Sequence, residues 1–81
     1  MMVVMFLTEA NNEKIVKIVS IDTGKGAKQR LIALGLHPND LIQIVSNPGF
    51  GPILIKNISK NDARIAIGRG IAQKIKVEYV N

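Results

Sequence analysis

Residues 24–38 read GKGAKQRLIALGLHP, and they carry the one clear helical pattern in the chain. On a helical period, Ala27, Leu31 and Leu34 fall on one face, which we expect to be buried. A helix this short is marginally stable by itself, so its apolar face must lie against another element. The rest of the sequence offers strands for that purpose.

The end of this helix is marked more sharply than its beginning. If Gly35 takes the left-handed conformation just past the last turn, Leu31 and Leu36 form the apolar pair of a Schellman closure. Pro38 then prevents the helix from resuming. The sequence therefore predicts a helix that stops at Gly35.

The chain around the helix shows short β-branched runs separated by turn signals, which is typical of a small barrel. We expect a mainly β fold, a small SH3-like barrel of about five strands with one short helix after the first strand. An OB-fold is the less favoured alternative, because its helix usually follows the third strand. The expected strands are 14–22, 41–46, 53–58, 63–67 and 74–79. Apolar residues on both sides of strand 14–22 indicate that it is buried on both faces or curls within the barrel.

Length and composition limit the possible functions. The 81 residues suggest one domain, residues 1–81, with a thin core. No cysteine is present, which excludes disulfides and thiolate chemistry. The net charge of +5 comes from scattered basic residues, so it fits either solubility or an anionic partner.

The apolar segment Met1–Leu7 lacks the features of a signal peptide and is far too short to span a bilayer. We therefore expect no direct insertion into a membrane. The segment is expected to form a covering strand or a flap over the barrel. The alternative is a surface for self-association, which leaves a homo-oligomer open.

No pattern in the sequence supports catalysis or a bound cofactor. The glycines of Gly24-Lys25-Gly26 do not have the spacing of a phosphate-binding loop, and we expect them to shape the start of the helix. His37 is the sole histidine, so a transition-metal site lacks a second nitrogen ligand, and no carboxylates pair at short spacing. We expect no catalytic, cofactor or metal residues and no enzyme activity. Nucleic acid is also not expected, because Phe50 and Tyr79 are the only aromatic residues past the start, too few for base stacking.

A protein partner is better supported. Ile32 lies away from the apolar stripe of the helix, and Phe50 stands at the tip of a loop rich in proline and glycine. Each could pack locally, Ile32 against the N-terminal flap and Phe50 against the mouth of the barrel. The alternative hypothesis is that they frame a groove for an apolar peptide or helix.

Several motifs taken together resemble the FeoA family over about residues 7–77. The resemblance is carried by Leu7-Thr8-Glu9-Ala10, Gly24, Gly26, Arg30-Leu31, Leu34-Gly35-Leu36, Pro38, Pro48-Gly49-Phe50-Gly51-Pro52, Ala66-Ile67, Ala72, Ile75 and Val77. The resemblance implies an SH3-like barrel and a cytoplasmic accessory role in bacterial ferrous iron uptake. The implied partner is the FeoB-type membrane GTPase transporter, contacted on its cytosolic side. The alternative is a FeoA-like barrel linked to an iron-dependent transcriptional regulator, or a basic barrel that binds nucleic acid.

Arg30 could play either of two roles. It could donate to a loop carbonyl or to Asp22, or it could reach an acidic surface on the transporter. The residues that we expect to contact the partner are Lys28, Arg30, Ile32, Leu36 and Phe50.

Overall fold

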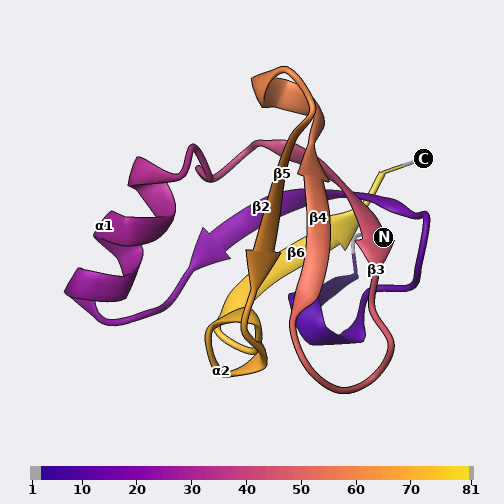
Figure 1. Ribbon diagram of the computed structural model, residues 1–81, viewed down its shortest axis with the longest axis horizontal. Helices are drawn as coiled ribbons and strands as arrows, with labels where there is room; N and C mark the ends of the chain where they lie inside the picture. Colours follow the sequence, from indigo (N-terminus) through magenta and orange to yellow (C-terminus); the bar gives the residue numbers. More distant parts are fainter. Residues whose placement is uncertain (1–2, 81) are drawn as a thin grey trace.

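A computed structural model describes residues 3–80 of the chain as a strongly curved antiparallel sheet with one helix beside it (Figure 1). In chain order the elements are β1 (Val4–Phe6), the 3-10 turn η1 (Leu7–Glu9), β2 (Ile15–Ile21), α1 (Lys25–Ala33), β3 (Leu41–Ser46), β4 (Ile53–Asn57), the 3-10 turn η2 (Ile58–Lys60), β5 (Ala63–Ile67), the single turn α2 (Arg69–Ala72) and β6 (Ile75–Tyr79). The strands are hydrogen-bonded in the order β1-β6-β2-β3-β4-β5. The predicted mainly β, SH3-like fold is confirmed, with six strands where about five were expected.

The additional strand comes from the apolar N-terminal segment. β1 pairs antiparallel with β6, from Val4 opposite Glu78 to Phe6 opposite Lys76. The expected covering strand is therefore present, as an edge of the sheet. Met1 and Met2, which belong to the same expectation, lie outside the described residues.

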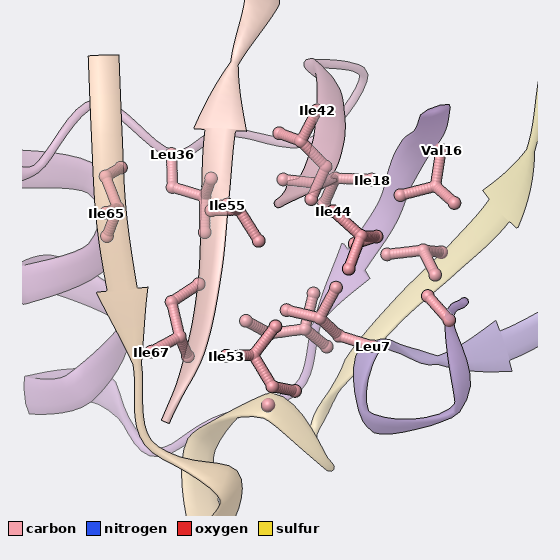
Figure 2. Packing of buried hydrophobic residues seen from close by; sticks show 14 of the residues in the cluster. Leu7, Val16, Ile18, Leu36, Ile42, Ile44, Ile53, Ile55, Ile65 and Ile67 are labelled. Atoms are coloured by element: carbon pink, nitrogen blue, oxygen red, sulfur yellow. The ribbon is translucent and has the colours of Figure 1, made fainter. Parts of the chain in front are cut away.

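The core fills the inside of the curved sheet and consists mainly of isoleucines contributed by every long strand (Figure 2). On β4, for example, Ile53 and Ile55 have no exposed surface. Their neighbours Leu54 and Lys56 face outward and are half-buried. This alternation is typical of a sheet with one face packed and the other solvated.

β2 curls within the barrel and is buried on one face. Ile18 is fully buried, whereas Ile15 is 38% and Val19 is 37% exposed. The pairing with β6 shifts register between Ile18 and Ser20, which marks a bulge. A bulge reverses the alternation of side chains, and it turns Ile21 into the core although Ile21 shares its sequence parity with Ile15. Of the two interpretations of this strand, burial on both faces is wrong.

The end of α1 has the predicted closure. Gly35 has a φ of 92°, its N–H donates to the Ile32 carbonyl at 2.9 Å, and the Leu36 N–H donates to the Leu31 carbonyl at 2.9 Å. Leu31 and Leu36 are both buried. These two hydrogen bonds and the apolar pair are the Schellman closure that the sequence indicated.

The predicted buried face of α1 is wrong at one position. Leu34 is 58% exposed, and Leu31 is the one residue of the helix that is buried. Figure 1 shows that α1 stands to the side of the strands, and the buried residue Leu31 lies in the last turn of the helix. The barrel therefore leaves part of the apolar face of the helix uncovered.

Candidate functional site

The uncovered face of α1 forms one wall of an open groove of about 170 Å³ between the helix and the end of β5 with α2. Leu31 of the helix and Ile67 of β5 are buried, so they form the floor. Leu34, the C-cap residue of α1, and Ile71 of α2 are the partly exposed walls. The complete lining is Ala27, Arg30, Leu31, Leu34, Ala66, Ile67, Gly68 and Ile71.

The local sequence explains why the groove stays open. The chain leaves β2 at Ile21, enters α1 at Lys25, and is held to the barrel again at the closure around Leu36. On the other side, β5 is the last strand of the sheet and has no strand paired with its outer edge within residues 3–80. A helix fixed mainly at one end, beside an unpaired strand, leaves room for a further apolar group.

The helix that forms one wall of the groove is basic. α1 contains Lys25, Lys28 and Arg30 and no acidic residue. The side chain of Arg30 makes no hydrogen bond or ion pair within residues 3–80, so neither of the local partners considered for it is observed. Asp22 instead lies 3.5 Å from the amino group of Lys76. Contact of Arg30 with an acidic surface stays a prediction.

The five expected contact residues do not form one surface. Lys28, Arg30 and Ile32 are exposed on α1, and Ile32 has 39% of its surface accessible. Leu36 is fully buried in the core, so including it among the contact residues was wrong, because its side chain completes the helix closure. Phe50 is 77% exposed in the loop between β3 and β4. That loop lies at the bottom of the view in Figure 1, well apart from α1, so Ile32 and Phe50 do not frame a common groove.

Sequence reasoning missed most of the groove. Leu34 was assigned to the core, and Ala66 and Ile71 were not considered as surface. Both belong to segments more than thirty residues beyond the helix, and local periodicity gives no information on such long-range neighbours. The available signal was the shortness of α1, which limits how much of its apolar face a small barrel covers.

Asp40, three residues after the single histidine His37, has a structural role. Asp40 is 6% exposed, and it accepts hydrogen bonds from the backbone N–H of His37, the amide of Asn57 and the amino group of Lys60 at 3.0, 3.0 and 3.3 Å. Burial by itself raises the pKa of Asp40, but these hydrogen bonds and the charge of Lys60 outweigh it, so the pKa lies below its ordinary value. A carboxylate held in this way is already satisfied and stays ionised.

Residues 3–80 contain no group of three or more His, Cys, Asp or Glu side chains placed to hold a metal ion. Among the same residues, no helix has the length and apolar character needed to cross a bilayer.

The fold and the groove together define a small SH3-like barrel with an open apolar groove beside its helix. The chain belongs to the FeoA family, because the model of the FeoA domain matches residues 5–79. A protein of Methanocaldococcus jannaschii, provisionally named Fe(2+) transport protein A, is 44% identical over 66 residues, which cover 82% of this chain and 73% of that relative.

Solved structures agree with this assignment. The crystal structure of an iron uptake regulatory protein (FeoA) superposes with a TM-score of 0.83 at 31% identity, covering 96% of this chain and 99% of the other. A manganese-dependent transcriptional repressor matches with a TM-score of 0.86 at 17% identity, covering 99% of this chain and 44% of the repressor. At that identity the likeness to the repressor shows the shared fold alone.

Proposed function

We propose that the chain is a non-enzymatic, cytoplasmic accessory protein of ferrous iron uptake that docks onto the cytosolic part of a FeoB-type GTPase transporter. Membership of the FeoA family and the iron-transport names of its relatives support this role. The observation that carries the docking proposal is the open groove beside α1, with its apolar floor and walls. An apolar groove flanked by a helix is a common way to bind an apolar segment of a partner.

The basic helix adds a preference for the partner's charge. Arg30 lines the groove, and the other charged residues of α1, Lys25 and Lys28, are also basic. Complementary charge across an interface favours the correct partner and speeds association. We therefore expect the bound segment of the transporter to carry apolar anchors with acidic residues beside them.

Binding to the purified cytosolic GTPase domain of the transporter tests this proposal by calorimetry. Leu34→Asp should weaken binding by about 30-fold or more, the loss expected for a central anchor of about 2 kcal/mol. Val3→Asp is the matched control, because Val3 is 63% exposed and lies outside the groove. Phe50→Asp tests the distant loop separately. Equal affinity of the wild-type chain and Leu34→Asp would contradict docking through the groove.

The second candidate is a barrel that serves a transcriptional regulator or binds nucleic acid. The similarity in fold to a manganese-dependent repressor and the net charge of +5 favour it. A salt titration separates the two, because contacts with nucleic-acid phosphates weaken steeply as salt rises and an apolar groove responds little. Binding of DNA that is lost at moderate salt, with no affinity for the transporter domain, would favour this second function.

A further inference from the structure

A second depression lies on the outer face of the sheet, over β3, β4 and β5, and has a polar character. Its volume is about 360 Å³, and it is lined by Glu13, Gln43, Ile44, Val45, Lys56 and Arg64. It shares no lining residue with the apolar groove beside α1. It is therefore a separate candidate site.

Two cations stand side by side in this depression because of the strand register. Lys56 of β4 lies directly opposite Arg64 of β5, and Gln43 of β3 lies opposite Lys56 on the other side. The adjacent residues Ile55 and Ile65 point into the core (Figure 2), so Lys56 and Arg64 both face outward. The sheet thus holds two positive charges and one amide in a row.

Glu13 also lines this depression, but it forms no ion pair with either cation. Three lysines elsewhere lie within 3.5 Å of a carboxylate oxygen, namely Lys17, Lys60 and Lys76. Within residues 3–80, neither Lys56 nor Arg64 forms an ion pair. Like charges directly opposite each other on neighbouring strands destabilise a sheet. A bound anion would remove this repulsion.

The wall of the depression is fixed in place by hydrogen bonds. The Glu13 backbone N–H donates to the Ile44 carbonyl at 2.6 Å, and the Gln43 amide donates to the Glu13 carbonyl at 3.2 Å. Lys56 is half-buried, so its stem is held by the sheet. The charged ends of Lys56 and Arg64 therefore project from a firm surface.

We infer that Lys56 and Arg64 form a binding site for a phosphate group. A phosphate monoester carries about 1.5 to 2 negative charges near neutral pH, which matches two unpaired cations, whereas a carboxylate neutralises one. An arginine fork contacts two phosphate oxygens and a lysine adds a point charge. Glu13 lines the same depression, and its negative charge opposes an anion, so it limits the affinity. The phosphate could belong to a small soluble compound or to a lipid headgroup.

The first experiment titrates the full chain with inorganic phosphate at constant ionic strength, set with chloride, while amide NMR signals are followed. Saturable shifts at Gln43, Lys56 and Arg64 are expected. Lys56→Gln and Arg64→Gln should each weaken binding by about tenfold or more. Lys74→Gln is the matched control, because it removes one charge from an exposed residue that does not line the depression.

Glu13→Gln supplies a test with the opposite sign. Removal of the opposing carboxylate should tighten phosphate binding by roughly twofold to fivefold. Melting temperatures without phosphate show whether the variants fold, and Lys56→Gln should keep or raise the value because it relieves repulsion with Arg64.

The second experiment distinguishes the sources of the phosphate by co-sedimentation with vesicles that contain phosphatidic acid or phosphatidylcholine alone. Binding to phosphatidic acid that Lys56→Gln and Arg64→Gln abolish and Lys74→Gln retains supports a lipid headgroup. A response to inorganic phosphate without vesicle binding supports a soluble ligand. Absence of saturable binding in both experiments, or an equal loss in Lys74→Gln, overturns the inference.

Discussion

The buried side-chain amide of Asn57 joins the carboxylate of Asp40 to the end of α1. Its nitrogen donates to Asp40 Oδ2 and to the Gly35 carbonyl, each at 3.0 Å, and its oxygen accepts from the Ser59 N–H at 3.1 Å. Asn57 has no exposed surface. One side chain of β4 therefore sets the position of the helix closure, and through it one wall of the apolar groove.

Replacement of this amide should be costly. Asn57→Ala leaves the Gly35 carbonyl and one oxygen of the buried Asp40 carboxylate without this donor, and we expect the free energy of unfolding to fall by about 2–3 kcal/mol. Chemical denaturation measures the change. Gln73→Ala is the control, since Gln73 is an exposed amide, and it should change stability by less than about 0.5 kcal/mol. Equal stability of the two variants would show that the Asn57 hydrogen bonds contribute little.

Acidification should weaken the fold through Asp40. The pKa of Asp40 in the folded state lies below its ordinary value of 3.8. The contribution of the ionised carboxylate to the free energy of unfolding is therefore complete above pH 3.8, and it is lost as the pH falls through the lower folded-state pKa. Urea melts between about pH 6 and about pH 2 measure this loss. Asp40→Asn should be less stable near neutral pH but should lose less stability on acidification. Parallel pH profiles for the two proteins would contradict this origin of the acid sensitivity.

Two glycines of the helical segment should respond in opposite ways to alanine. A methyl group meets no atom within 4 Å at either Gly26 or Gly35, so backbone conformation decides the result. Gly35 has a φ of 92°, and Gly35→Ala should lower stability by about 1–2 kcal/mol. Gly26 lies within α1, and Gly26→Ala should raise stability by about 0.5 kcal/mol. Thermal denaturation of both variants checks the difference in sign.

Two leucines at the C-terminal end of α1 should separate folding from binding. Leu31 is 4% exposed, and Leu31→Ala should lower the free energy of unfolding by about 2–3 kcal/mol. Leu34 is 58% exposed, and Leu34→Ala should change it by less than about 0.5 kcal/mol. Denaturant melts of both variants, with the wild type alongside, measure the two effects. A large loss of stability in Leu34→Ala would mean that the groove is closed in solution.

Local sequence patterns predicted a structural feature correctly where a few neighbouring residues determine it. The Schellman closure followed from Gly35, Leu36 and Pro38, because the left-handed position and the stop are encoded within a few residues. The inward turn of Ile21 could not be predicted, since a bulge depends on pairing with a strand more than fifty residues away. Register and bulges depend on how two strands pair, whereas hydrophobic periodicity is read from one strand alone.

The candidate groove was less accessible to sequence reasoning for a similar reason. Arg30 was recognised on the helix, but the opposite wall comes from Ala66 and Ile71. Whether Leu34 is covered depends on how far the barrel extends beneath α1, which is a matter of tertiary geometry. The sequence also suggested a link between Ile32 and Phe50, which the topology places on separate parts of the surface.

Because α1 is attached to the barrel at its last turn, folding constrains the end of the helix more than its first turns. Residues near Gly35 are constrained by the closure and by Asn57, whereas Lys25, Lys28 and the other exposed positions of the first turns contact little of the barrel. Substitutions in these first turns can therefore alter which surface the helix recognises with little effect on folding. A designer who wishes to redirect this scaffold to a new target would randomise those turns and leave the closure around Gly35 unchanged.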